Sequence, residues 1–408
     1  MQQKKIIIIG GGASGYFTAV NIAMQCPTAH ITILEKTNKV LSKVKISGGG
    51  RCNVTHHCFE VNELIKQYPR GGHFLKKCLY QFSTSDTVAW YAKQGVALHT
   101  ESDGRMFPTT NSSDTIINCL TSLCKQYGVQ VMMQAGVSSF VPNATGYTVT
   151  TTNGGSMQCT HLVIATGGYP KLDQYNWLQQ SIAQLPVVQP VPSLFTCNIP
   201  KHSITELMGV SVPNAQVKIQ GTKLAQAGPV LITHWGLSGP AVLKLSAYAA
   251  IELAKLNYHY TITVNWAYPH NETTLLQQWK LLTTTTQTVA NSNPLGLPNR
   301  LWLYLLAQCG IPATIRWAAV GKDKQNALIK ILTTHTLTVQ GKTTYKEEFV
   351  TSGGISVDCI NPATMEHKHV PKVYCVGEVL NVDGITGGFN FQHAWSSGYI
   401  AAQAIVHS

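Results

Sequence analysis

The sequence predicts an α/β protein built around a parallel β-sheet. Four consecutive isoleucines, residues 6–9, form the apolar centre of a short strand, the glycine-rich segment 10–15 follows at once, and residues 16–24 have the pattern of a helix. A second apolar strand is expected at residues 30–34. A third, within residues 160–168, ends in small residues, as is required where a ligand lies at the carboxyl edge of a parallel sheet. This order of elements is typical of a Rossmann-like unit.

The first turn contains the GxGxxG pattern as Gly10, Gly12 and Gly15. The first glycine permits a tight turn, the second lets a pyrophosphate approach the backbone, and the third lets the helix pack closely on the strand. Free N–H groups at the helix start attract phosphate. Glu35, 20 positions after Gly15, is placed to accept hydrogen bonds from an adenosine ribose, and it would repel the 2′-phosphate of NADP. The alternative, a glycine turn that binds nothing, is disfavoured because every part of the motif is in place.

Bulk properties bound the class of protein. A chain of 408 residues is too long for one core, so two or three domains are expected. No uninterrupted apolar stretch reaches the ~18 residues that span a bilayer, and the early first strand leaves no room for a signal peptide. The eleven cysteines, an odd number without CxxC pairs, indicate reduced thiols. We expect a cytoplasmic protein that does not associate with membranes.

The net charge of +12 has two interpretations. Only 12% of the residues are charged, so the imbalance reflects a shortage of acids more than an excess of bases. A nucleic-acid partner or an anionic ligand would account for it. However, no run of Lys or Arg is longer than two residues, and no basic helix is evident. A solvated basic surface is therefore favoured, and no nucleic-acid partner is expected.

A second glycine-rich turn ends a polar loop at residues 37–53. Three successive glycines leave backbone N–H groups uncovered, which suits the close approach of a flat ring. The adjacent Arg51 could hold an anion or a ring carbonyl, although a flexible surface loop is an equally good interpretation of the local sequence. The nearby Cys52, His56, His57 and Cys58 match no common zinc spacing, so no metal site is predicted.

The middle of the chain predicts a separate inserted domain. Before it, helices are expected at 74–93 and 113–127, and an antiparallel layer at 129–133, 136–141, 147–151 and 157–159. Prolines 186, 190 and 192 mark a linker. Residues 193–343 then combine strands at 210–219, 229–233 and 258–265, a helix at 241–254, a mainly helical part at about 270–333 and a strand at 334–349. The domains are therefore 1–192, 193–343 and 344–408.

The last part of the chain is again punctuated by glycines. An apolar strand at 373–376 leads into Gly377 and Glu378, and a third glycine turn covers residues 383–390. A helix with many small residues follows at 392–406, and its start would direct N–H groups at a ligand beside the turn. Taken alone, an amphipathic terminal helix is an equally good interpretation.

Together, the segments GGGASG, SGGGRCN, ATGG, HWGLSGPAVLKLS and VGEVLNVDGITGGFNFQHAWSSGYIA resemble the aminoacetone-oxidase-like (BaiN-like) group of FAD-binding oxidoreductases. The resemblance covers essentially the whole chain. It implies a discontinuous Rossmann-like FAD-binding domain of the two-dinucleotide-binding flavoprotein type, formed by 1–192 and 344–408. It also implies that the insert is a β-barrel with a helical subdomain.

The resemblance also implies the residues that bind the cofactor. The first turn would hold the FAD pyrophosphate, Glu35 the ribose, residues 47–53 the isoalloxazine ring, Glu378 or Asp383 the ribityl hydroxyls, and residues 387–390 the flavin pyrimidine edge. The predicted cofactor-binding residues are Gly10, Gly12, Ala13, Ser14, Gly15, Glu35, Lys36, Lys43, Ser47, Gly48, Gly49, Gly50, Arg51, Cys52, Asn53, Thr166, Gly167, Gly168, Gly377, Glu378, Asp383, Gly387, Gly388, Phe389 and Asn390. Arg51 and His393 are the candidate catalytic residues, and His393 is equally well explained as a packed helix residue.

Three functions remain open at this point. The favoured one is an FAD-dependent oxidoreductase that transfers a hydride to or from a small organic substrate, as an amine oxidase or an enone reductase does, with NAD(P)H or oxygen as electron partner. The second is a non-catalytic or RNA-associated flavoprotein that uses the basic surface. The third, an NAD-dependent dehydrogenase, leaves the second and third glycine turns without a role. The sequence determines neither the substrate nor the oligomeric state.

Overall fold

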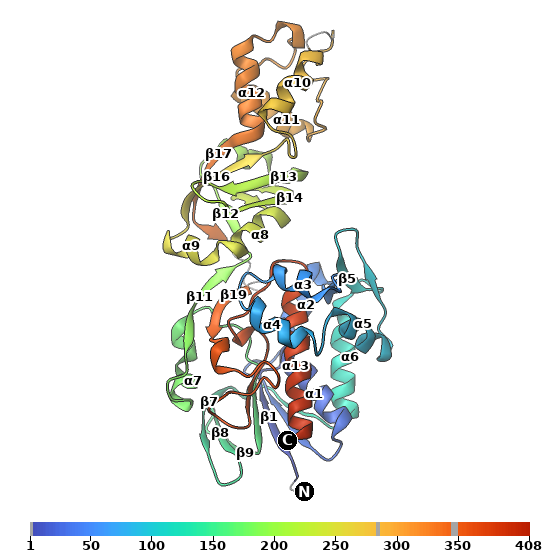
Figure 1. The fold of residues 1–408 in the computed structure, drawn as a ribbon, viewed down its shortest axis with the longest axis vertical. Coiled ribbons are helices and arrows are strands. Elements are labelled where there is room, and N and C mark those ends of the chain that lie inside the picture. The colour runs from blue at the N-terminus through green and yellow to red at the C-terminus, as the bar shows by residue number, and fades with distance from the viewer. Residues whose placement is uncertain (1–2, 283–285, 344–349) are drawn as a thin grey trace. The chain divides into compact units, whose positions relative to one another are not determined.

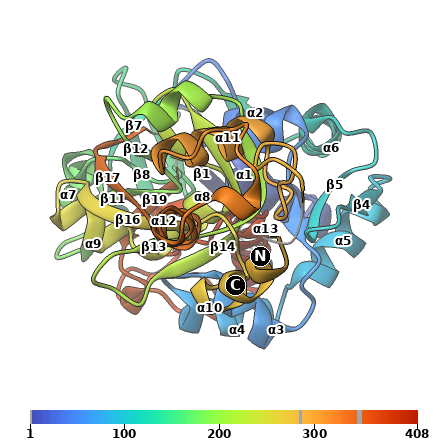
Figure 2. The ribbon, with the colours of Figure 1, turned by 90° about the horizontal axis from the view of Figure 1, so that it is seen from above.

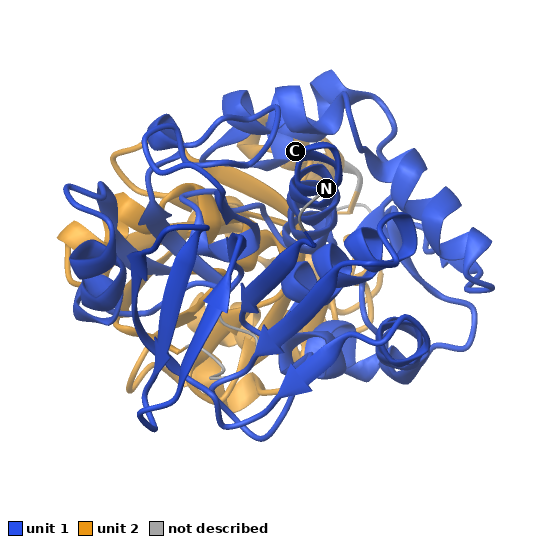
Figure 3. Ribbon diagram, turned by 90° about the horizontal axis from the view of Figure 1, so that it is seen from below, with its two compact units in different colours: residues 1–192, 346–408 blue, residues 193–345 orange. Residues whose placement is uncertain are grey.

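A computed structural model describes residues 3–282, 286–343 and 350–408 of the chain. The chain divides into two compact units (Figure 3). Unit 1 consists of Met1–Pro192 and Lys346–Ser408, and unit 2 of Ser193–Tyr345. The predicted boundary between 343 and 344 adjoins residues 344–349, which lie outside the described part. Unit 1 contains four of the described sheets, and unit 2 contains the fifth.

Unit 1 is built on a five-stranded parallel sheet. The strand order is β20-β10-β1-β2-β6, and every neighbouring pair is parallel. The strands are β1 (Lys5–Ile9), β2 (His30–Leu34), β6 (Gln130–Met132), β10 (His161–Ile164) and β20 (Val373–Cys375). The two ends of the chain thus contribute to one sheet, because β20 pairs with β10, which pairs with β1. The predicted fold class, a Rossmann-like α/β domain with a parallel sheet, is confirmed.

Two helices from opposite ends of the chain cross closely in unit 1. They are α1 (Ala13–Gln25) and α13 (Phe389–His407), which lie side by side in Figure 1. Small residues allow this approach: a Cβ added to Gly398 would lie 2.9 Å from Oγ1 of Thr18. Aromatic rings fill the space around the crossing, with Phe17 centred 4.5 Å from Trp90 and 5.2 Å from Trp395. The first and last helices therefore share one core.

Smaller elements complete unit 1. Three short sheets flank the parallel one: β3 (Thr55–His56) with β4 (Leu98–Thr100) and β5 (Arg105–Pro108); β7 (Val137–Pro142) with β8 (Tyr147–Thr151) and β9 (Ser156–Cys159); and β11 (Val187–Ser193) with β19 (Val350–Ile355). The remaining helices are α2 (Ser42–Gly50), α3 (Val61–Leu64), α4 (Gly72–Leu79), α5 (Thr84–Lys93), α6 (Ser113–Gln126) and α7 (Asn176–Ser181), with short 3-10 helices η1 (Ile65–Gln67), η2 (Leu172–Tyr175), η5 (Val357–Cys359) and η6 (Gly377–Val379).

Unit 2 contains an antiparallel sheet that closes on itself. The strand order is β17-β16-β13-β14-β15-β12-β18, formed by β12 (Thr196–Asn198), β13 (Ser211–Ile219), β14 (Ala225–Thr233), β15 (Gly236–Ser238), β16 (His259–Asn265), β17 (His335–Gln340) and β18 (Lys342–Thr343). The strands at the two ends of this order, β17 and β18, are consecutive in the chain and are joined by Gly341, which has a φ of +92°. Gly341 N donates to the carbonyl oxygen of Tyr258 (2.8 Å), and its own carbonyl accepts from Asn198 N (3.2 Å). The sheet is therefore a barrel.

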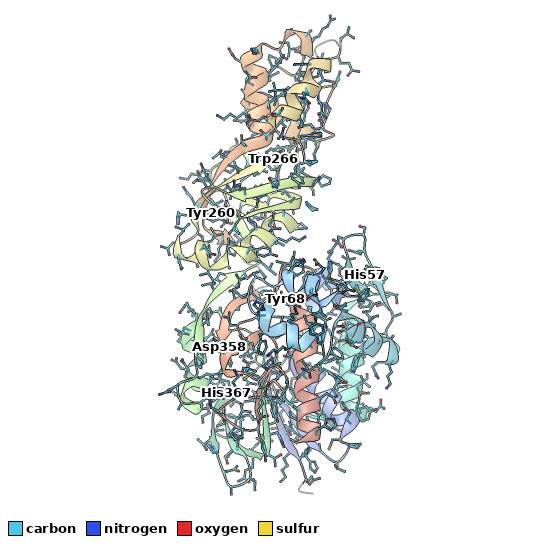
Figure 4. The ribbon with its side chains drawn as sticks, in the orientation of Figure 1. His57, Tyr68, Tyr260, Trp266, Asp358 and His367 are labelled. Atoms are coloured by element: carbon cyan, nitrogen blue, oxygen red, sulfur yellow. The ribbon has the colours of Figure 1, made fainter. Side chains whose placement is uncertain are left out.

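Helices fill and extend the barrel of unit 2. They are α8 (Pro240–Tyr248), α9 (Ala250–Lys255), α10 (Glu272–Leu282), α11 (Asn299–Gln308) and α12 (Lys322–Thr334), with η3 (Ser203–Leu207) and η4 (Trp317–Ala319). One apolar cluster joins inward strand residues such as Val217 and Ile262 to helix residues such as Trp302 and Leu328. Figure 4 marks Tyr260 on β16 and Trp266 just after it, and both belong to this cluster. Unit 2 thus has a core of its own.

Several predicted elements differ from the structure. The helix expected at 74–93 is two helices, because Ser83 forms a capping box with Asp86 and starts α5 anew. The strand expected at 129–133 in the antiparallel layer is β6 of the parallel sheet, where it pairs with β2. The helix expected at 241–254 is interrupted at Ala249. The polar loop contains α2, and α13 begins at Phe389 instead of 392. Of the strand expected at 334–349, β17 and β18 are present, and residues 344–349 lie outside the described residues.

Candidate functional site at the carboxyl edge of the parallel sheet

The three glycines of the first turn have different surroundings. A Cβ on Gly10 would lie 2.3 Å from the carbonyl oxygen of Ala165, and one on Gly15 would lie 2.1 Å from that of Gly10. Neither position can hold a side chain without displacing backbone. A Cβ on Gly12 would meet no atom within 4 Å. Gly12 also precedes the first residue of α1, so open space lies where the helix presents its N–H groups.

The carboxylate of Glu35 fastens this turn to the end of β2. Its Oε2 accepts a hydrogen bond from Gly11 N (2.8 Å), and its Oε1 accepts from both the N–H and the hydroxyl of Thr37 (2.9 Å each). Next to it, Lys36 is exposed, with Nζ 5.4 Å from the centre of the Tyr169 ring. The predicted ribose contact of Glu35 stays a prediction, and the structure adds a role in shaping the turn.

The second glycine turn follows directly from the first. Leu41 N donates to the carbonyl oxygen of Gly11 (2.8 Å), which starts α2 beside the first turn. The helical backbone ends before Ser47, and Gly48, Gly49 and Gly50 all have positive φ, at 59°, 69° and 84°. A Cβ on Gly48 would press against Phe107 at 2.8 Å, whereas Gly49 and Gly50 face open space.

Arg51 is held over an aromatic ring at the end of this turn. Its guanidinium carbon lies 4.1 Å from the centre of Phe107, and its Nη1 donates to Oε1 of Glu101 (2.6 Å). Arg105 Nη2 donates to the other oxygen of Glu101 (2.7 Å). One carboxylate thus positions two cations. Arg51 remains about one-third exposed, so its charge is available to a ligand.

The residues after Arg51 connect the second and third glycine turns. The Asn53 amide, in the orientation that satisfies both of its groups, accepts from Gly388 N (2.9 Å) and donates to the carbonyl oxygen of Thr55 (3.0 Å). Cys52 is fully buried, and burial raises the pKa of its thiol to about 12. A thiol of this kind stays protonated, so its predicted place near the ring does not make it a nucleophile.

Residues after β10 and β20 meet at Glu378. Its Oε2 pairs with Nζ of Lys43 (2.5 Å), and its Oε1 accepts from Thr351 N (2.9 Å). A Cβ on Gly167 would lie 4.0 Å from this carboxylate, and one on Gly168 would lie 2.7 Å from Cβ of Thr351. Thr166, the preceding residue, is half-buried at the same strand end. Segments near positions 43, 167 and 378 are thereby brought together.

Gly377 links the C-terminal segment to the first turn. Its φ is +72°, and a Cβ there would lie 2.5 Å from Oγ of Ser14 in α1. The neighbouring Ala13 is half-buried at the start of the same helix. Because Ser14 lies within the dinucleotide motif, the contact places Gly377 beside the first glycine turn.

Asp383 has a different environment from that of Glu378. Its fully buried carboxylate is paired with Arg70, whose Nε donates to Oδ1 (2.6 Å) and whose Nη2 donates to Oδ2. The Asp383 side chain is fully buried, whereas that of Glu378 is 17% exposed, so the structure favours Glu378 over Asp383 for contact with a ligand. Arg70 was not among the predicted site residues. The Gly71–Gly72 pair that follows it is the only local signal.

The third glycine turn is braced from several sides. Asn390 accepts from Gly384 N (2.8 Å) and donates to its carbonyl oxygen (3.0 Å). The hydroxyl of Tyr68, marked in Figure 4, donates to the carbonyl oxygen of Phe389 (2.8 Å). His56 stacks on Phe389, and its Nδ1 lies 3.0 Å from the carbonyl oxygen of Gly387. The N-terminus of α13 is thus fixed beside the segment that follows the second turn.

His393 lies inside this assembly. It is 1% exposed, and its Nε2 donates to the carbonyl oxygen of Gly377 (3.1 Å). Burial lowers the pKa of His393 to about 4, so the ring is neutral at physiological pH. Its Nδ1 has no partner among the described residues. The predicted catalytic role is untested, and these contacts are those of a residue that positions the turn at 377.

The structure therefore brings the predicted residues to one edge of the parallel sheet. Contacts connect the first turn to the second through Gly11, the second to the third through Asn53, and the first to the strand end at Gly377 through Ser14. Sequence reasoning missed Glu101, Thr351 and Tyr68, which belong to no motif. In the described part of the chain, no group of three or more His, Cys, Asp or Glu is arranged to hold a metal ion. His57, marked in Figure 4, is exposed.

Comparison with known proteins agrees with this geometry. Residues 4–404 match the family described as HI0933-like protein Rossmann domain. The chain belongs to this family. It is 32% identical over 414 residues to "Ribosomal RNA dihydrouridine synthase" of Escherichia coli K12, covering 100% of this chain and 99% of the relative. It is 24% identical to "3-dehydro-bile acid delta(4,6)-reductase" of Clostridium scindens, covering 98% of each. The narrower BaiN-like grouping suggested by the motifs stays a prediction.

Solved structures share the fold of this HI0933-like protein. A 3-ketosteroid delta1-dehydrogenase from Sterolibacterium denitrificans aligns over 100% of both chains, with a TM-score of 0.52 and 12% identity. A quinol-fumarate reductase aligns over 100% of this chain and 72% of its own, with a TM-score of 0.52 and 13% identity. In the residues that the structure describes, no helix meets the length and hydropathy needed to cross a bilayer.

Proposed function

We propose that this protein is an FAD-dependent reductase of a carbon–carbon double bond conjugated to a carbonyl group, and that its substrate is uridine in ribosomal RNA. The observation that carries the proposal is the full-length match at 32% identity to a protein named ribosomal RNA dihydrouridine synthase. The open glycine edge of the parallel sheet supports it, because it offers a site for the flavin that such a reduction requires.

The residues present fit FAD. Gly12, Gly49 and Gly50 leave open space at the first and second turns, whereas Gly10 and Gly15 are closed by backbone. The N-termini of α1 and α13 offer N–H groups and positive helix ends to the pyrophosphate and to the flavin, respectively. Glu378 offers an acceptor for hydroxyl groups, with Lys43 beside it. When bound and reduced, FAD would supply the hydride for the reaction.

The substrate class follows from what the relatives' names have in common. Dihydrouridine forms when the C5–C6 double bond of uracil, which is conjugated to a ring carbonyl, gains two hydrogens. A delta(4,6)-reductase that acts on a 3-dehydro bile acid also reduces double bonds conjugated to a ketone. Of the two substrates, RNA is supported by the higher identity and by the basic composition, for which a solvated basic surface is the alternative explanation. This choice replaces the small organic substrate and the absence of a nucleic-acid partner expected from the sequence.

Arg51 is the side chain best placed to assist the reduction. A cation near the carbonyl conjugated to the double bond would stabilise the negative charge that develops there as hydride arrives. Phe107 and Glu101 fix the guanidinium beside the glycine turn without covering it. Arg51→Gln should lower the rate of reduction about 10²-fold while flavin content is retained. Arg105→Gln, which removes the other cation on Glu101, is the matched control and should have a much smaller effect.

The direct test combines cofactor identification with turnover. Mass spectrometry of the molecule released from purified protein should identify FAD, and release of NAD would instead support a dehydrogenase. Anaerobic mixing with NADH or NADPH should bleach the flavin absorbance if either is the electron donor. Ribosomal RNA prepared from cells that lack the protein should then gain dihydrouridine, measured by nucleoside mass spectrometry. Flavin reduction with no product from ribosomal RNA, but with product from a small enone, would contradict the RNA substrate.

A further inference from the structure

The positive charge of the molecule is concentrated in unit 2. Residues 193–345 contain twelve Lys and Arg against four Asp and Glu, which gives +8 of the total +12. Unit 1, although larger, contains eighteen against fourteen. Lys280 is not considered in this comparison. The other ion pairs found among the described residues all join two residues of unit 1. Among the described residues, most cations of unit 2 therefore have no carboxylate partner that would neutralise their charge.

The acidic residues of unit 2 lie on its helices and not on its barrel strands. Glu206 lies on η3, Glu252 on α9, Glu272 on α10 and Asp323 on α12. Strands β12 to β18, as described, contain no Asp or Glu. An anion that approaches the strand surface of the barrel is therefore not repelled by a carboxylate on those strands.

One face of the barrel presents polar groups in register. On β13, β16 and β17, alternate residues point into the core, and the others face outward. Lys218 pairs with Thr263, which pairs with Thr336. The next outward row pairs Thr261 with Thr338, and a third pairs His259 with Gln340. Figures 1 and 2 show the three strands side by side, and Lys223 lies exposed in the turn after β13.

The side chains of this face suit a nucleic-acid backbone. Lysines contact phosphates, and hydroxyl and amide groups donate to phosphate or accept from a ribose 2′-hydroxyl. Aromatic rings of these strands, such as Tyr260, point into the core, so the face lacks the platforms on which unpaired bases stack. The chemistry favours recognition of the sugar–phosphate backbone over recognition of base sequence.

We propose that the outward face of β13, β16 and β17, together with Lys218 and Lys223, binds the sugar–phosphate backbone of the RNA substrate. The proposal rests on the proposed function for its choice of RNA. It assigns a function to unit 2, which contributes none of the predicted cofactor-binding residues. Sequence specificity would then come from elsewhere in the enzyme, because backbone contacts carry none.

The test compares two charge-reversed variants of the full-length, FAD-loaded protein. Lys218→Glu with Lys223→Glu alters the proposed face, and Lys93→Glu with Lys125→Glu makes the same change in net charge on exposed helix positions of unit 1. Binding to protein-free bacterial ribosomal RNA is measured between about 0.05 and 0.2 M salt. The first variant should bind about tenfold or more weakly, with a shallower salt slope by roughly one unit per lost phosphate contact. The second should bind as the unaltered protein does.

Three results would overturn the proposal. They are an equal loss in both variants, no loss in either, or tighter binding of the unaltered protein to anionic phospholipid vesicles than to RNA. Lys218→Gln with Lys223→Gln, which removes charge without adding acid, separates lost binding from misfolding, because it should give a smaller loss of the same kind. Flavin content and bleaching by NAD(P)H are measured in every sample. Failure of these with RNA binding intact would contradict the proposed function and leave the RNA-binding face supported.

Discussion

At the residue scale, the glycines of the first two turns are needed for different reasons. Gly10 and Gly15 are required by packing, since a Cβ at either would meet a carbonyl oxygen at 2.3 or 2.1 Å. Gly49 and Gly50 are required by their positive φ values of 69° and 84°, whereas Gly12, with a φ of −91° and no atom within 4 Å of an added Cβ, is required neither by packing nor by its backbone conformation. A glycine that the fold does not need is best explained by a ligand that needs the space. This distinction separates structural from binding positions in a way that the motif alone does not.

The glycines therefore predict two opposite outcomes. Gly12→Ala should leave the stability of the FAD-free protein within about 0.5 kcal/mol, because the new methyl group meets nothing, but should weaken FAD binding. Gly15→Ala should lower the free energy of unfolding by about 1–3 kcal/mol, because the methyl group displaces backbone. Thermal unfolding of the FAD-free variants and FAD titration measure the two effects. Normal FAD affinity in Gly12→Ala would place the pyrophosphate elsewhere.

His393 predicts a pH dependence of stability. Its folded-state pKa of about 4 lies below the unfolded value of about 6.5, so the unfolded chain takes up the proton first as the pH falls. The contribution of His393 is complete above about pH 6.5 and is lost towards pH 4, by up to about 3 kcal/mol. His393→Gln should lose less thermal stability than the unaltered protein between pH 7 and pH 4.5. His57→Gln, at an exposed site, is the control, and identical curves for all three proteins would contradict the assignment.

At the scale of elements, the sequence predicted the parts that local pattern determines. The strand, turn and helix at the N-terminus were predicted closely, because apolar runs and glycines mark them directly. The prediction that β6 belongs to the antiparallel layer was wrong, because its pairing with β2 depends on the path of the chain in three dimensions and not on the sequence of the strand. Glu101 was missed for a similar reason: its partner Arg51 lies 50 residues away and no motif joins them. The glycine segments that meet at the sheet edge were predictable from the sequence, but the side-chain pairs between them were not.

The crossing of α1 and α13 is the element contact on which the site most depends. Gly398→Ala should lower the free energy of unfolding by about 1–3 kcal/mol, because its Cβ would lie 2.9 Å from Oγ1 of Thr18 and 3.1 Å from the carbonyl oxygen of Ser14. Since Ser14 belongs to the first turn, FAD affinity should fall as well. Gly321→Ala in unit 2, where a Cβ meets nothing within 4 Å, is the matched control. Equal stability of the two variants, measured by thermal unfolding, would show that the helices can separate without loss.

At the scale of the whole molecule, charge and cofactor are assigned to different units. Unit 1 holds the glycine edge, and unit 2 holds most of the net charge and a separate apolar core. The net charge of the whole chain does not reveal this asymmetry, so taken alone it favours a solvated basic surface. Dividing the chain at the boundaries found in the structure makes the basic barrel evident.

Separate cores predict separate unfolding. Heating should give two transitions, because each unit has its own buried cluster, and saturating FAD should raise only the transition of unit 1. At 100 times the dissociation constant, the added stability is about 2.7 kcal/mol. Calorimetry with and without FAD measures this. An equal shift of both transitions would show that the units unfold together.

The pairing of β20 with β10 has a consequence for biosynthesis. The glycine edge that we propose for FAD is assembled from residues near positions 12 and 377, so the nascent chain must extend past unit 2 before that edge exists. At about 5–20 residues per second, the ribosome needs roughly 10–50 s to pass from β10 to α13. Unit 2 has time to fold in that interval, during which β10 is paired with β1 on one side only. A translation product interrupted before α13 would remain colourless, and capture of the yellow cofactor would mark the moment when synthesis of the nucleotide-binding unit is finished.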